Sequence, residues 1–107
     1  MIKPGVDLRG LTPQMAVAFS IAQNIFREKA GASCVITSGS DGTHGPNSLH
    51  YKGKALDLRT NNLRPEQVHP VYATLKIALG AQFDVVLEED HLHVEFDPKE
   101  PAKSEDA

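Results

Sequence analysis

Apolar residues recur at helical spacing in two stretches of the chain. The first stretch opens with Thr12-Pro13, a hydroxyl N-cap followed by proline at the first helical position, and closes near Ala30-Gly31. The second opens at Pro65 and stops at Gly80. Their apolar positions are Met15, Val17, Ala18, Ile21, Ala22, Ile25 and Phe26, then Val68, Val71, Tyr72, Leu75 and Leu79. The spacing predicts one helix in each stretch.

Four shorter segments have the apolar content or the alternation of strands. They are 34–37, 54–59, 83–88 and 91–96. The pair Glu89-Asp90 between the last two reads as a short hairpin turn. Residues 1–11 are expected to be an irregular lead-in. The order helix, strand, loop, strand, helix, hairpin predicts an α+β domain with a small, mainly antiparallel sheet and helices packed on one side.

Length and composition indicate one ordinary globular domain. The chain has 107 residues, which suits a single domain over 1–97. Residues 98–107 have almost nothing to bury and are expected to form a disordered tail. The net charge is -3 with no basic stripe, so nucleic acid is a poor candidate partner. The single Cys34 excludes an internal disulfide, and we expect it to be a small core residue.

No apolar run near the N-terminus is long enough for a signal peptide, and nothing approaches a membrane span. We therefore expect synthesis in the cytoplasm without a signal peptide. We also expect a monomer.

Alternation along the predicted strands sorts the polar side chains. Positions 55, 57 and 59 share one face, as do 91, 93 and 95. If these strands are neighbours, Asp57 and His93 approach each other on one face of the sheet. His50 would reach in from the preceding loop, with Gly53 allowing a tight turn and the small Ala55 leaving room. Three such ligands with one position left for water are typical of a catalytic zinc site.

Plain alternatives exist for each of these residues. An exposed hairpin often carries a pair such as His91-x-His93, and Asp57 alone could cap a strand end. His69, on the polar face of a predicted helix, is expected to be a surface residue.

Two motifs resemble a known family of zinc peptidases. The run Ser48-x-His50-x-x-Gly53-x-Ala55-x-Asp57, followed by Asp90-His91-x-His93, is similar to the zinc D-Ala-D-Ala carboxypeptidase and L-alanoyl-D-glutamate endopeptidase family. That family shares its fold with the hedgehog signalling domain. The stretch 37–50 looks like the small members carried by bacteriophages and prophages. The resemblance runs over about 35–96.

The resemblance implies a role for each matching position. The ligands of one zinc ion would be His50, Asp57 and His93. Asp90 would be the general base and acid, and His91 would stabilise the oxyanion or orient the substrate. The implied substrates are peptidoglycan stem peptides, cut next to D-amino acids.

Three further residues are expected at the substrate side of this site. Ser48 would fix the loop that carries the first histidine. Many family members have an arginine shortly after a Ser-Gly pair, where this chain reads Ser40-Asp41. Either His44 or Arg59 would then hold the substrate charge, or the carboxylate of a C-terminal substrate would not be held in this way. This departure weakens the carboxypeptidase interpretation relative to the endopeptidase one.

Two indications from the sequence disagree on the identity of the base. Simple alternation puts Glu89, not Asp90, on the histidine face, whereas the family spacing selects Asp90. Glu89 is therefore the second candidate for the base, and Glu88 is a weaker third candidate. Glu95 and Arg59 could simply pair with each other across the strands.

The predicted function is therefore a zinc-dependent metallopeptidase of cell-wall peptides, an endolysin of phage or prophage type that acts on the wall after release. The alternatives are a non-catalytic binding module that keeps the fold and the zinc, as hedgehog domains do, and a virion component of the same fold. The presence of Asp90 together with His91 favours activity, because a purely structural zinc site needs neither.

Overall fold

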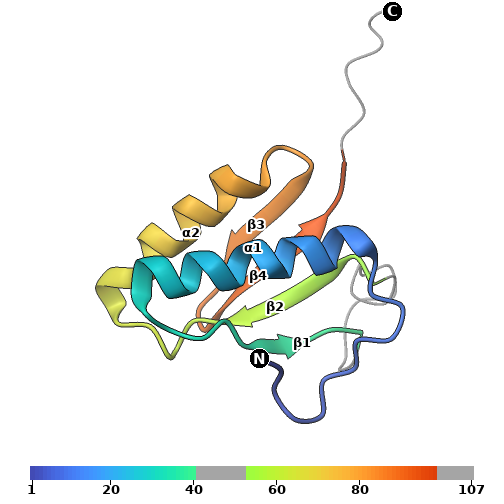
Figure 1. The fold of residues 1–107 in the computed structure, drawn as a ribbon, viewed down its shortest axis with the longest axis horizontal. Coiled ribbons are helices and arrows are strands. Elements are labelled where there is room, and N and C mark those ends of the chain that lie inside the picture. Colours follow the sequence, from blue (N-terminus) through green and yellow to red (C-terminus); the bar gives the residue numbers. More distant parts are fainter. Residues whose placement is uncertain (41–52, 99–107) are drawn as a thin grey trace, which may run out of the picture.

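The computed structural model describes residues 1–40 and 53–98 and confirms the predicted α+β architecture (Figure 1). The elements, in chain order, are α1 (Pro13–Ala30), β1 (Ile36–Ser38), β2 (Ala55–Arg59), α2 (Pro65–Leu79), β3 (Phe83–Leu87) and β4 (His91–Phe96). The predicted tail lies outside the described residues except for Pro98. Residues 41–52, which include His44, Ser48 and His50, also lie outside them.

The four strands form one sheet in the order β1-β2-β4-β3, and every neighbouring pair is antiparallel. Both helices lie on the same face of this sheet (Figure 1). The hairpin of β3 and β4 is the one predicted at Glu89-Asp90. β4 lies between β2 and β3 in this order. The end of the first zinc-peptidase-like motif, on β2, and the end of the second, on β4, therefore lie on neighbouring strands in the centre of the sheet.

The helices begin and end where the sequence predicts. The Thr12 side chain accepts a hydrogen bond from the backbone N–H of Met15, and Gly31 ends α1 in the left-handed conformation at φ 60°. At the start of α2, the backbone N–H of Arg64 donates to Gln67 Oε1 at 2.9 Å. These contacts satisfy backbone groups that a helix end otherwise leaves without partners.

The first strand differs from its prediction. It covers Ile36–Ser38, two residues later at its start than the expected 34–37. The lead-in is also more regular than expected, because Ile2 forms an isolated parallel bridge with Ile36. The backbone N–H of Lys3 donates to the Ile36 carbonyl at 2.9 Å, and the N–H of Ile36 donates to the Met1 carbonyl at 2.9 Å. The N-terminal segment therefore covers the outer edge of β1.

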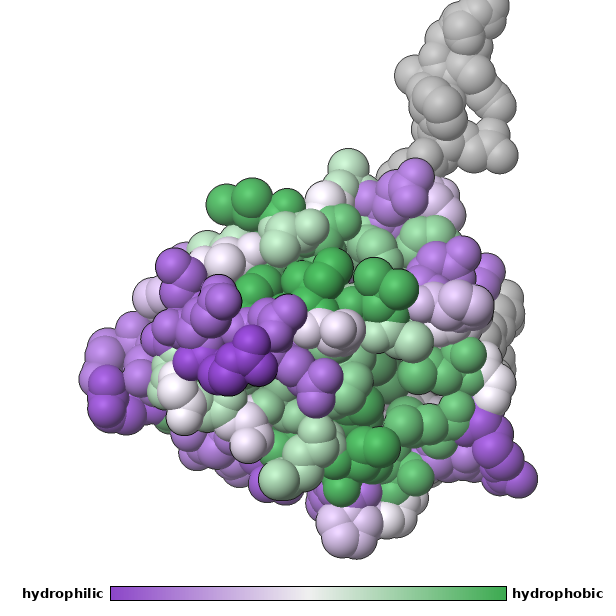
Figure 2. All heavy atoms as spheres, in the orientation of Figure 1, coloured by the Kyte–Doolittle hydropathy of each residue, from purple (hydrophilic) through white to green (hydrophobic). Residues whose placement is uncertain are grey.

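The hydrophobic core lies between the helices and the sheet. Its large buried side chains from α1, α2, β2 and β4 include Met15, Phe26, Val71, Leu75, Leu56, Leu58, Leu92 and Val94. Alternation then directs Asp57 and His93 to the opposite face of the sheet, away from the helices. Figure 2 shows the helix-covered face, where apolar residues gather in the middle and hydrophilic residues lie toward the end at which α1 stops and α2 begins. Neither described helix is apolar over enough length to cross a membrane.

Gly53 joins the start of β2 to the segment that precedes α1. Its φ is +70°, and a Cβ there would collide with the backbone of Gly10. Its carbonyl accepts a hydrogen bond from the Thr12 N–H at 3.0 Å, which holds the two segments together. The prediction that glycine is needed for a tight turn at this position is confirmed.

We expect Gly53→Ala to lower the free energy of unfolding by more than the ~1–2 kcal/mol that a left-handed backbone costs other residues, because the collision adds to that cost. Urea unfolding followed by circular dichroism measures the change. Gly10→Ala is the matched control, since Gly10 has φ +78° but open space around the added Cβ. An equal loss in the two variants would mean that the close approach at Gly53 contributes nothing.

Candidate metal centre

Asp57 and His93 lie directly opposite each other in the pairing of β2 with β4. Asp57 Oδ1 is 3.1 Å from His93 Nδ1, and the two side chains are only 14% and 22% exposed. This confirms the expectation that the two residues approach each other on one face of the sheet. Ala55, two residues before Asp57 and on the same face of β2, is fully buried.

The spacing of these two atoms suits a zinc ion. Tetrahedral zinc binds nitrogen and oxygen ligands at ~2.0–2.1 Å, which places two such ligands about 3.3 Å apart. The 3.1 Å between Asp57 Oδ1 and His93 Nδ1 is close to that separation. The other ring nitrogen, His93 Nε2, is hydrogen-bonded to Glu95 Oε1 at 2.7 Å. Nδ1 is thus the nitrogen of His93 that would hold a metal.

His93 is flanked by two carboxylates, and they change its protonation. Its pKa is raised to about 9 from 6.5, mainly by the hydrogen bond to Asp57 and with help from Glu95, although burial acts in the opposite direction. In the metal-free protein the ring is therefore charged at neutral pH and donates from both nitrogens. This ion pair stabilises the metal-free fold fully below about pH 6.5, and the contribution is lost as the pH rises through about 9.

We expect zinc to displace the Nδ1 proton of His93, because a metal binds neutral imidazole. Binding at pH 7 should release a proton, and zinc affinity should rise as the pH approaches 9, the pKa of His93 in the metal-free protein. Calorimetric titrations of zinc in buffers of different ionisation enthalpy give the number of protons released on binding. A binding enthalpy that is the same in every buffer would contradict a charged His93.

Asp90 and His91 form a second pair beside the first. His91 Nδ1 lies 2.7 Å from Asp90 Oδ1, and His91 Nε2 is 3.7 Å from Asp57 Oδ1. The hydrogen bond from His91 is the main cause that lowers the pKa of Asp90, so this carboxyl is ionised near neutral pH. Its side chain is 77% exposed and accessible to solvent. The turn between β3 and β4 breaks the simple alternation that favoured Glu89.

Asp57 of the first pair and both members of the second pair, Asp90 and His91, line a cavity of about 360 Å³. Its lining residues are Lys3, Thr37, Ser38, Asp57, Arg59, Asn61, Asp90 and His91. Glu88 and Glu89 are not among them. Of the candidate metal ligands, Asp57 lines this cavity together with the candidate base Asp90, and His93 contacts Asp57 without lining the cavity.

Arg59 lies in this cavity, as its predicted substrate-binding role requires. The alternative that it pairs with Glu95 is wrong, because the register sets Arg59 opposite His91 and Glu95 opposite Ala55. Lys3 also lines the cavity, although it was not among the predicted site residues. No local motif marks it, and it reaches the cavity only because the N-terminal segment pairs with β1.

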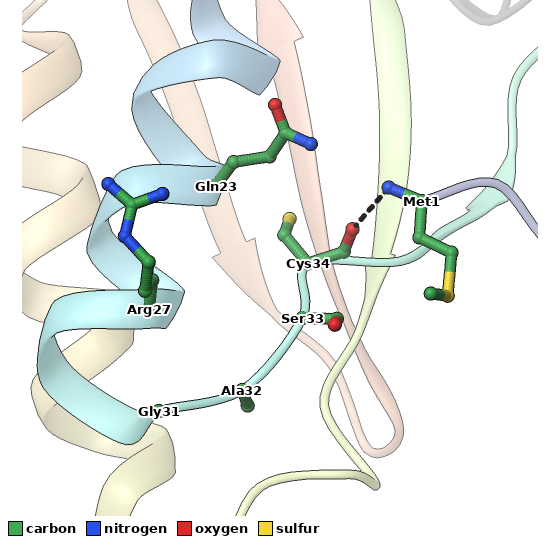
Figure 3. Close-up of a pocket in the computed structure, with 7 residues that line it drawn as sticks. All are labelled: Met1, Gln23, Arg27, Gly31, Ala32, Ser33 and Cys34. Carbon is green, nitrogen blue, oxygen red and sulfur yellow. Dashed lines mark hydrogen bonds between the residues drawn. The ribbon is translucent and has the colours of Figure 1, made fainter.

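A second cavity, of about 410 Å³, has Cys34 among its lining residues (Figure 3). The N-terminal amine of Met1 donates to the Cys34 carbonyl at 3.1 Å across its edge. Burial raises the pKa of the Cys34 thiol to about 12, so it is not an available nucleophile. This confirms Cys34 as a core residue. Neither Asp57 nor His93 lines this cavity.

The remaining predicted site residues are His44, Ser48 and His50. All three lie in 41–52, outside the described residues, so their roles stay predictions.

Comparisons with known proteins identify the family. The Hedgehog amino-terminal signalling domain matches residues 18–97, from within α1 to the end of β4. The chain is 32% identical over 77 residues to the Indian hedgehog protein of Gallus gallus and 33% identical over 78 residues to the Sonic hedgehog protein of Danio rerio. Each alignment covers 70% of this chain but only 18% of the relative. The match agrees with the predicted hedgehog-type fold, and on this evidence the chain belongs to the Hedgehog amino-terminal signalling domain family.

Proposed function

We propose that this chain is a zinc-dependent peptidase that hydrolyses peptide bonds of peptidoglycan stem peptides next to D-amino acids. One observation carries the proposal. The Asp90–His91 pair opens onto the same 360 Å³ cavity as Asp57, whose carboxylate lies against His93. A site that only holds a metal needs its ligands and their partners, but it needs neither an exposed carboxylate nor a second imidazole at its mouth.

Each residue then has a task in hydrolysis. Asp57 and His93, together with His50, would hold one zinc ion. When bound there, zinc lowers the pKa of a water molecule and polarises the scissile carbonyl group. Asp90 takes a proton from the attacking water and passes it to the leaving amine. His91, held by Asp90, orients the substrate or stabilises the developing oxyanion.

Two cations support an anionic substrate. Lys3 and Arg59 line the cavity that also contains Asp57 and Asp90. Lys3 and Arg59 offset the negative charge of Asp57 and Asp90 in this cavity, so that a carboxylate of the substrate would meet positive charge there as well. Stem peptides offer such carboxylates at D-residues, which agrees with the substrate class that the motifs imply.

We expect Arg59→Gln to raise KM about 10-fold or more with a smaller change in kcat, because a hydrogen bond to a charged group contributes roughly 1.5–3 kcal/mol. Steady-state kinetics on a synthetic stem peptide measures both constants. Arg27→Gln is the matched control, since Arg27 lines the cavity beside Cys34 instead. Unchanged KM in Arg59→Gln would remove this residue from substrate binding.

A non-catalytic binding module is the second candidate, because the matched relatives are named hedgehog proteins. Digestion of purified peptidoglycan, with and without a chelator, separates the two. We expect new termini, identified by mass spectrometry, that are absent after chelation and return with added zinc. Peptidoglycan that stays intact with the zinc-loaded protein would contradict peptidase activity. Monomeric behaviour and action on the wall after release from the cell belong to the same proposal.

A further inference from the structure

We infer that Glu95 is a positioning residue, one that holds His93 in the orientation and tautomer in which its Nδ1 can bind a metal. This inference rests on the proposed zinc site and adds a residue that the sequence motifs do not contain. The motifs end at His93, whereas Glu95 is the next residue of β4 that shares its face.

The contact itself is short and partly buried. His93 Nε2 donates to Glu95 Oε1 at 2.7 Å, and the two side chains are 22% and 23% exposed. Ala55 lies opposite Glu95 in the register and has only a methyl group there. The Glu95 side chain can therefore lean along the strand toward His93 rather than toward a large neighbour on β2.

The chemistry of imidazole explains why this contact matters for a metal. A neutral histidine has one N–H and one lone pair, and the hydrogen bond made by one nitrogen decides which nitrogen keeps the lone pair. With Nε2–H donated to Glu95, the lone pair belongs to Nδ1. That atom points toward Asp57 Oδ1, 3.1 Å away. Carboxylates in this outer position also raise the basicity of the ligand imidazole.

A more diffuse effect competes with this explanation. Glu95 forms a group with Asp84 and Asp97, whose carboxylate oxygens lie within 4.8 Å of one another. The negative field of all three would attract a cation without any role in orientation. Asp84 lies directly opposite Glu95 in the pairing of β3 with β4. Removing the charge of Asp84 changes the net charge of the group by one unit, as removing the charge of Glu95 does. Asp84→Asn is therefore a matched control.

The test compares zinc affinities, measured by competition with a chelator, and needs no turnover. We expect Glu95→Ala to lower the affinity about 10–100-fold, the range found for outer partners of metal ligands. Glu95→Gln, which keeps the shape and an acceptor oxygen, should lose less. Asp84→Asn should stay within about threefold of the parent, because a partly solvated charge at a distance is screened.

A second readout separates positioning from a merely structural role. Long-range proton–nitrogen NMR correlations of the zinc-loaded parent should show His93 protonated at Nε2 and bound through Nδ1. In Glu95→Ala the Nε2 proton should exchange faster, with the thermal unfolding midpoint of the metal-free protein used to confirm folding. Parent-like zinc affinity in Glu95→Ala, or an equal loss in Asp84→Asn, would overturn the inference. A parent protein that binds no zinc would overturn the proposed function and this inference with it.

Discussion

Replacing Asp57 with Asn should abolish zinc binding at concentrations where the parent chain is saturated. Asp57 Oδ1 lies 3.1 Å from His93 Nδ1, and the change removes the negative charge that both the metal and the His93 cation require. We expect the loss of affinity to exceed the ~10–100-fold typical of outer partners, because Asp57 itself would be a ligand. Peptidase activity should fall below detection at the same time.

Chelator competition on the purified variant measures the first effect, and release of stem-peptide fragments measures the second. Asp97→Asn is the control, since Asp97 follows the end of β4 and belongs to the acidic group around Glu95 rather than to the cavity. Zinc binding that survives in Asp57→Asn would place the metal elsewhere in the chain and contradict the proposed centre.

Asp90→Asn should separate catalysis from metal binding. Asn keeps an acceptor for the His91 ring but can no longer take a proton, so we expect turnover to fall about 10²–10⁴-fold, the range for general acid–base groups. Zinc affinity should stay within about threefold, because Asp90 is not a ligand. Steady-state kinetics and chelator competition on the same preparation give both numbers.

Glu89→Gln is the matched control for that experiment, because Glu89 is the adjacent acid that simple alternation favoured. We expect it to keep the turnover of the parent, since Asp90, not Glu89, lines the cavity. The reverse pattern would assign the base to Glu89. A chain in which neither substitution changes any measured function would be the binding module instead.

Local patterns were sufficient to predict most elements of the fold. Thr12-Pro13 and Gly31 specify the ends of α1 through backbone chemistry that acts over a few residues. The twofold alternation of strands specified that Asp57 and His93 would share a face, and their pairing in the sheet confirms it. These predictions succeed because the deciding interactions lie within one element or between two strands of known periodicity.

The misses depend on contacts between distant segments. Lys3 reaches the cavity because Ile2 pairs with Ile36, a pairing that no local pattern indicates. Simple alternation favoured Glu89 over the Asp90 that the family spacing selects, and Asp90 lines the cavity because alternation ends where the hairpin turns. Glu95 was weighed as a partner of Arg59, but its register opposite Ala55 leaves it beside His93. Register and turn geometry are set by the whole sheet, so sequence periodicity alone does not determine them.

The most direct test of the zinc centre is anomalous diffraction at the zinc edge from a crystal of the zinc-loaded protein. We expect one strong peak at about 2.0–2.2 Å from both Asp57 Oδ1 and His93 Nδ1, the distances at which zinc binds these atoms, with His50 as the third protein ligand. A peak at the carboxylates of Asp84, Glu95 and Asp97 instead, or no peak between Asp57 and His93, would contradict the proposed centre.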